Sequence, residues 1–161
     1  MRKSPRPPDL VVRQRQRLWP LNTTRIQRWA RSALPQCLAA ARPGAPLLSL
    51  ACVEVSLLSN RAIARVHAEF FADPSPTDVI TFDHGEILVG AGIVSHQAET
   101  FGHTPTAEAA LCVIHGLLHL AGWQDERPQD ASAMRKKQAM IFDQAGKTLS
   151  SPAAISAGGA R

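Results

Sequence analysis

Residues 111–125 read Leu-Cys-Val-Ile-His-Gly-Leu-Leu-His-Leu-Ala-Gly-Trp-Gln-Asp, and the rest of the chain is organised around this stretch. The run is largely apolar and free of proline, which predicts a helix. Side chains four residues apart share one helix face, so His115 and His119 can reach the same metal ion. Gly122 is placed to end the helix in a left-handed conformation and to reverse the chain. The reversal brings Asp125 back toward both imidazoles.

These three side chains, His115, His119 and Asp125, would give an ion two nitrogens and one oxygen. Three protein ligands with one open position are typical of catalytic zinc sites, whereas structural zinc is usually closed by four ligands. Zinc lowers the pKa of a bound water toward about 7, which makes hydrolysis the expected reaction class. The alternative interpretation is a pair of core histidines in a buried helix, followed by an exposed acid in a loop.

The whole chain has the composition of a single globular domain, with 161 residues of which 45% are hydrophobic. It contains no apolar run long enough to span a membrane, and its charged N-terminus lacks the apolar segment of a secretory signal. The cysteines are few and widely spaced, at Cys37, Cys52 and Cys112, as in proteins with reduced thiols. We therefore expect a cytoplasmic protein with no membrane partner.

The positive charge is concentrated at one end of the chain. Nine of the 18 Lys and Arg residues lie in residues 1–31, together with a single acid, whereas the remainder carries nine basic and twelve acidic residues. A basic end on a nearly neutral body suggests a polyanionic partner, RNA first, bound through its phosphates. A solvated tail and helix face would explain the same charges.

Helices and strands are expected in mixed order, which predicts an α+β domain with a single small sheet of about four strands and the histidine helix lining a cleft. The domain is expected to span residues 10–145, between a flexible basic tail (1–9) and a disordered tail (146–161). The expected strands are 11–18, 47–58, 77–82 and 86–89, and the expected helices are 24–41, 61–70, 93–101, a histidine helix starting at Pro105 with Thr104 as its cap, and 128–144.

Three blocks of the sequence, in order, resemble the YbeY family of zinc-dependent endoribonucleases. Residues 115–125 resemble its H-G-x-L-H-L-x-G-Y-D-H signature, residues 77–82 its T-D-V-L-S-F strand, and residues 85–89 its G-D-I-V-I strand. The resemblance covers about residues 50–142. It implies a single-strand-specific endoribonuclease of ribosomal RNA maturation, in which a zinc-bound water attacks a phosphodiester, with ribosomal RNA and the ribosome or its small subunit as partners.

The sequence departs from the family pattern in two places. Gln124 and Asp125 stand where the signature usually has Asp and His, although a carboxylate is also an acceptable zinc ligand. The family usually carries an arginine shortly before the T-D-V block, suited to a phosphate, and Phe71 occupies that position here. Loss of such a charge motivates a second hypothesis, a non-catalytic, zinc-containing ribosome-assembly or RNA-binding factor. Residues of the preceding helix that could cover the same surface are Arg61, Arg65 and His67.

A distant alternative is a metzincin-like peptidase, because the spacing of the histidines, the glycine and the acid is similar. Those enzymes have a glutamate after the first histidine as general base, whereas this chain has Gly116. Two other acids have two interpretations each. Glu86 could orient a ligand histidine or be an ordinary edge carboxylate, and Glu108 could approach the metal or simply favour the start of its helix.

Overall fold

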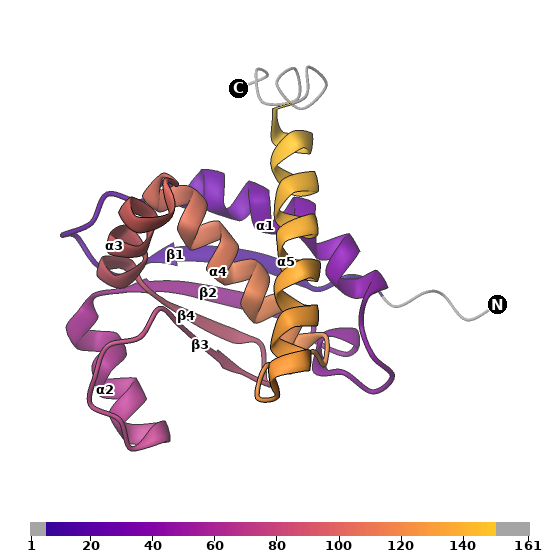
Figure 1. The fold of residues 1–161 in the computed structure, drawn as a ribbon, viewed down its shortest axis with the longest axis horizontal. Helices are drawn as coiled ribbons and strands as arrows, with labels where there is room; N and C mark the ends of the chain where they lie inside the picture. Colours follow the sequence, from indigo (N-terminus) through magenta and orange to yellow (C-terminus); the bar gives the residue numbers. More distant parts are fainter. Residues whose placement is uncertain (1–5, 151–161) are drawn as a thin grey trace.

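The computed structural model describes residues 6–150 and contains one open four-stranded sheet of order β1-β2-β4-β3 (Figure 1). Neighbours β1, β2 and β4 are parallel, and β3 runs antiparallel to β4. The described strands are β1 (Asp9–Gln14), β2 (Cys52–Leu58), β3 (Val79–Phe82) and β4 (Glu86–Gly90). The predicted α+β fold with a sheet of about four strands is confirmed.

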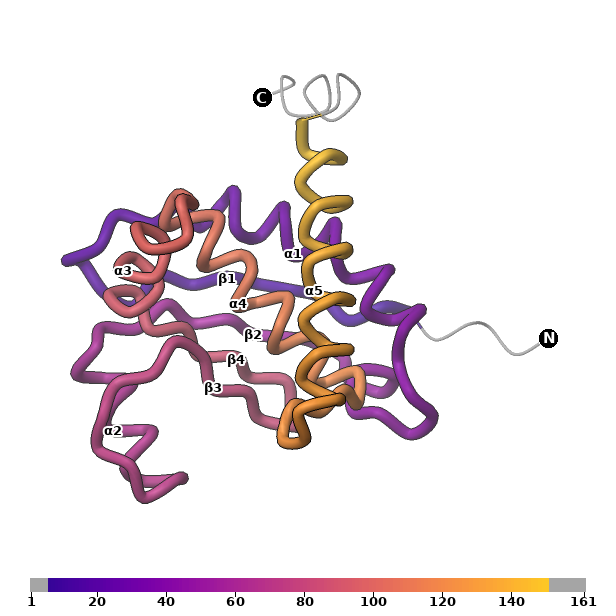
Figure 2. The backbone as a smooth tube through the Cα atoms, viewed as in Figure 1, coloured from indigo at the N-terminus to yellow at the C-terminus, as the bar shows by residue number. Residues whose placement is uncertain are grey.

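The helices lie on both faces of this sheet. On one face α4 packs against β3 and β4 and also contacts three other helices, α1, α3 and α5 (Figures 1 and 2). On the other face Ile63 of α2 joins Ile80 and Leu88 of the strands in a smaller apolar cluster. The helices are α1 (Thr23–Ala39), α2 (Asn60–Phe71), α3 (Ala91–Phe101), α4 (Pro105–Leu120) and α5 (Pro128–Leu149), with a 3-10 helix η1 (Pro46–Leu48) before β2.

The ends of α4 follow from local sequence. The Thr104 hydroxyl accepts a hydrogen bond from the Ala107 amide at 3.2 Å, and Pro105 occupies the first helical position, where no amide donor is needed. Gly122, just beyond the C-terminus, has a φ of 91°, in the left-handed region that glycine adopts without strain. Both predicted signals are confirmed, and together they fix where the chain turns after His119.

The middle of α4 lies unusually close to the sheet. A Cβ on Gly116 would sit 2.9 Å from Ile87 Cδ1 and 2.9 Å from Thr81 Oγ1. Glycine therefore lets the helix backbone settle directly onto β3 and β4. There is also no room here for the glutamate that a metzincin-like peptidase carries after its first histidine.

Three expected elements differ from the observed bounds by more than two residues at one end. The first strand ends at Gln14 rather than residue 18, because the Gln16 side chain closes a turn by bonding both the amide (2.8 Å) and the carbonyl (2.7 Å) of Trp19. Residues 47–51 are not strand, since Pro46 starts η1 and the strand begins at Cys52.

The last helix continues to Leu149 rather than ending at residue 144. At Gly146 a Cβ would meet the Trp29 ring at 3.1 Å, so the end of α5 packs closely against α1. The expected disordered tail (146–161) thus begins inside a helix, and its residues 151–161 lie outside the described part of the chain. The expected N-terminal tail (1–9) overlaps β1 at Asp9, and its first five residues are likewise not described.

Candidate metal centre

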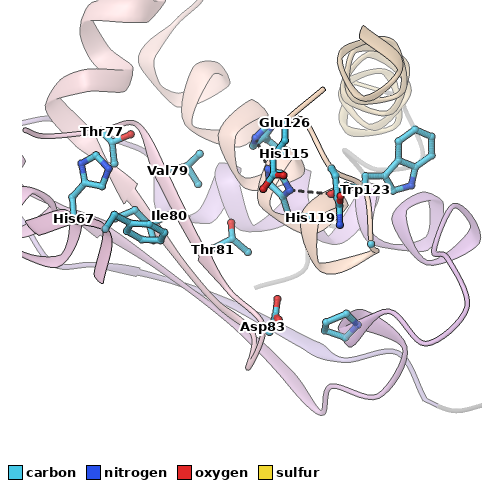
Figure 3. Close-up of a pocket in the computed structure, with 14 residues that line it drawn as sticks. His67, Thr77, Val79, Ile80, Thr81, Asp83, His115, His119, Trp123 and Glu126 are labelled. Atoms are coloured by element: carbon cyan, nitrogen blue, oxygen red, sulfur yellow. Dashed lines mark hydrogen bonds between the residues drawn. The ribbon is translucent and has the colours of Figure 1, made fainter. Parts of the chain in front are cut away.

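The two histidines of α4 and the acid beyond the turn converge in space. His115 Nε2 and His119 Nε2 are 3.0 Å apart, and Asp125 Oδ2 lies 3.5 Å from each of them. The ligand atoms of the three residues all lie within 4.8 Å of one another, so the group could hold a metal ion. Figure 3 shows both imidazoles at one side of the adjoining pocket.

The Nδ1 atom of each imidazole already makes a hydrogen bond within the protein. His119 Nδ1 donates a hydrogen bond to the Trp123 carbonyl at 3.0 Å, and His115 Nδ1 donates to Gln138 Oε1 at 2.7 Å. In the neutral rings both Nε2 atoms then carry lone pairs, which face each other and the Asp125 carboxylate. Such an arrangement is repulsive unless a proton or a cation lies between the three groups, and two imidazoles with one carboxylate are suitable zinc ligands. The donor set therefore fits a divalent cation.

The protonation state of His115 also favours metal binding. Burial lowers the pKa of this imidazole below its ordinary value, and the neighbouring His119 adds to that effect. The Gln138 hydrogen bond and the charges of Asp125 and Asp78 act in the opposite direction without reversing it. A lowered pKa keeps the ring neutral, which is the form that binds metal.

A cleft of about 580 Å³ opens beside the two imidazoles. In Figure 3, Val79, Ile80 and Thr81 of β3 lie between the imidazoles and the side of the cleft formed by His67. Among the described residues that line it there is no lysine or arginine, and Asp83 and Glu126 are acidic. The predicted cleft beside the histidine helix is therefore present, with a mixed wall of aromatic, apolar and polar residues that is mildly acidic.

The secondary candidates lie elsewhere. Glu86 pairs with His84 at 3.0 Å, and both side chains are largely exposed. Arg61 and Arg65 are exposed on α2 and are not among the residues that line the cleft. Glu108 is buried and its carboxylate accepts a hydrogen bond from His103 Nδ1 at 2.9 Å, so it is engaged at the start of α4.

Sequence reasoning missed Gln138, which orients His115 from α5. A signal was present, because Gln138 lies in helical register with the buried residues Met134 and Ile141 of the same helix. A polar side chain on an apolar helix stripe usually has a buried partner. Which partner it has follows only from how α5 packs on α4.

Fold and site together define an α+β protein with a His-His-Asp group able to hold a metal ion at one side of a cleft. Comparison of the sequence with known families then identifies the family. The family described as Endoribonuclease YbeY matches residues 11–146, and the chain belongs to this family. The resemblance read from the three sequence blocks is thereby confirmed.

Individual relatives agree with this assignment. The chain is 33% identical over 114 residues to an Endoribonuclease YbeY of Gloeobacter violaceus, covering 60% of this chain and 59% of that protein. It is 32% identical over 108 residues to one from a Sulfurovum species, covering 58% of this chain and 72% of that protein. The solution structure of TM1509 from Thermotoga maritima is similar, with a TM-score of 0.60, 26% identity and coverage of 89% and 93% of the two chains. No helix in residues 6–150 has the length and apolarity needed to cross a membrane.

Proposed function

We propose that this protein is a metal-dependent endoribonuclease that cleaves single-stranded RNA during ribosomal RNA maturation in the cytoplasm. His115, His119 and Asp125 would hold one zinc ion. The observation that carries the proposal is the convergence of their ligand atoms within 4.8 Å beside a cleft, in a chain of the Endoribonuclease YbeY family.

The protein's own groups prepare this site before any ligand arrives. The Trp123 carbonyl and Gln138 fix the two rings so that both Nε2 atoms point at one place. The Asp125 side chain is 42% exposed, so the ligand group is accessible to solvent. When bound, a zinc ion would act as a Lewis acid toward a water molecule and a phosphoryl oxygen, and so supply the hydrolytic chemistry.

RNA outside the cleft would be held by the basic N-terminal part of the chain. Arg25 and Arg28 are exposed on α1, where they can neutralise phosphates. Other arginines of this region also support the fold: Arg31 Nε donates to the Leu10 carbonyl at 3.1 Å, and Arg13 Nε bonds Glu54 at 3.2 Å. We therefore assign RNA contact to the α1 surface before the β1 arginines.

The second candidate function is a non-catalytic, zinc-containing ribosome-assembly or RNA-binding factor. The observation in its favour is that Phe71 lines the cleft and that none of the described lining residues is lysine or arginine. Against it, Arg135 lines a second hollow of about 400 Å³ together with His115 and Asp125. Its guanidinium is a candidate to offset charge on a phosphate during cleavage.

A cleavage assay separates the two functions. The purified protein is incubated with a single-stranded RNA oligonucleotide, with the same sequence as a duplex, and with each after chelation and after zinc is restored. The proposal predicts cleavage of the single strand that chelation removes and zinc restores. RNA binding without metal-dependent cleavage would favour the assembly factor.

A further inference from the structure

Two aromatic side chains of α2 form the side of the cleft away from the metal ligands. His67 and Phe71 are four residues apart, so they share one helix face, and both line the cleft. Their ring centroids are 5.7 Å apart with an interplanar angle of 54°. Phe71 is 55% exposed, which leaves much of its side chain open to a ligand.

The loop after α2 holds this pair in place. His67 Nδ1 donates a hydrogen bond to the Ser75 carbonyl at 2.8 Å. Ser75 in turn donates from its amide (2.9 Å) and its hydroxyl (2.6 Å) to Asp73 Oδ1, and these bonds lower the pKa of the Asp73 carboxyl. The imidazole is thereby oriented through Nδ1, and no hydrogen bond to another described residue uses its Nε2.

The neighbouring aromatic residue, Phe70, packs against the sheet instead of lining the cleft. Phe70 packs edge to face on Phe82 of β3, with ring centroids 5.0 Å apart, and does not line the cleft. Phe70 and Phe71 are almost equally exposed, at 59% and 55%. Position in the cleft, rather than exposure alone, distinguishes them, and this makes Phe70 a matched control.

The chemistry of the wall selects the kind of group that fits there. Among the described lining residues there is no lysine or arginine, and Asp83 and Glu126 disfavour an anion. A flat, uncharged aromatic group suits such a wall, and an unpaired nucleobase is such a group in RNA. Proteins commonly bind single-stranded RNA by stacking bases on Phe, Tyr, Trp or His side chains.

We propose that Phe71 is the stacking platform for one unpaired base of the bound strand, and that His67 Nε2 makes a hydrogen bond to the same nucleotide. This inference rests on the proposed function, because it takes RNA as the substrate. A paired base cannot leave its stack to reach Phe71 without the duplex opening. The subsite therefore contributes to preference for single strands and gives Phe71 a role in binding rather than in the chemical step.

The test uses Phe71→Leu, which keeps an apolar side chain but removes the ring, with Phe70→Leu as control and Phe71→Trp as a rescue. The substrates are one single-stranded oligonucleotide and a series in which each base in turn is replaced by an abasic residue. With wild type, one abasic position should raise KM about five-fold or more, as expected for loss of a stacked base. Phe71→Leu should raise KM on the intact strand by a similar factor and leave kcat unchanged. In this variant the same abasic position should cause no further rise in KM. Phe71→Trp should have a KM close to that of wild type.

Equal KM values for Phe71→Leu and Phe70→Leu on the intact strand would overturn the subsite and leave the nuclease assignment untouched. If wild type cleaves no RNA, the proposed function fails, but the subsite is still tested by fluorescence anisotropy with the same labelled oligonucleotide in the presence of chelator. Weaker binding by Phe71→Leu than by Phe70→Leu would then support it, and equal binding would refute it.

Discussion

The two sides of the cleft are built in different ways. On one side, His115 and His119 come from the buried helix α4, are about 25% and 30% exposed, and each is fixed by a hydrogen bond at its Nδ1 atom. On the other side, Phe71 is the last residue of α2, is 55% exposed, and its ring contacts that of His67. The imidazoles assigned to chemistry are thus held in fixed orientations, while the Phe71 ring assigned to base stacking is 55% exposed. Substitutions on the two sides should therefore affect different properties, namely metal binding and cleavage on one side and RNA affinity on the other.

The largest contrast is expected between His119→Ala and Phe71→Leu. His119→Ala removes one of three candidate ligands, so metal binding and RNA cleavage should fall to background while affinity for the strand changes little. Phe71→Leu should weaken the strand affinity and keep the metal. Metal content, RNA affinity and kcat measured on both variants check this separation. A His119→Ala protein that still cleaves at the wild-type rate after metal stripping would contradict it.

Gln138→Leu tests the metal-binding side of the cleft alone. The substitution removes the acceptor that orients His115 from α5, so zinc affinity should fall by about 10- to 100-fold, as is typical when the partner of a ligand histidine is lost. Lys136→Ala, an exposed change on the same helix, is the control and should leave the affinity unchanged. Competition with a fluorescent zinc chelator measures both. Equal affinities would mean that Gln138 does not position the ring.

Stability should distinguish α4 from α2. Gly116→Ala places a methyl group 2.9 Å from Ile87 and Thr81, and overpacking of this kind costs about 1–3 kcal/mol of unfolding free energy. Ala68→Leu on the exposed face of α2 should stay within about 0.5 kcal/mol of wild type. Urea unfolding compares the two, and Ile87→Val should recover part of the loss in Gly116→Ala by making room. Similar stabilities for Gly116→Ala and wild type would show that the helix can move away from the sheet.

The smallest expected effect is a pH dependence of the metal-free protein. The pKa of His115 is lower in the folded state than in the unfolded chain, chiefly because the ring is buried. As the pH falls from above the unfolded value of about 6.5 through the folded pKa, the unfolded state binds the proton first, so the protein loses stability. In chelator, His115→Gln should remove this part of the slope of unfolding free energy against pH as the pH falls below about 6.5. An unchanged slope would mean that the burial of His115 does not govern its protonation.

The metal group could be predicted from sequence because its parts are local. Two histidines one helical turn apart, a glycine with the φ of a chain reversal and an acid soon after it lie within 11 residues, and helix geometry relates them. The caps of α4 are likewise encoded beside the site. The strand bounds near Gln16 and Pro46 were harder, since a side-chain turn and a 3-10 start compete with the β pattern.

Contacts between distant segments could not be predicted in the same way. Gln138 meets His115 only because α5 packs on α4. The His67–Phe71 pair could be located on one helix face from spacing, but its place on the cleft wall depends on how α2 packs beside β3. These contacts depend on how helices and strands pack together, which the hydrophobic periodicity of the sequence does not predict.

Elemental analysis of the purified protein tests the central claim most directly, namely that His115, His119 and Asp125 hold one ion. We predict one zinc per chain in wild type, and a marked loss of zinc in His115→Ala and Asp125→Ala at unchanged far-ultraviolet circular dichroism. A wild-type protein that takes up no divalent metal after incubation with zinc, or variants that retain a full equivalent, would contradict the account.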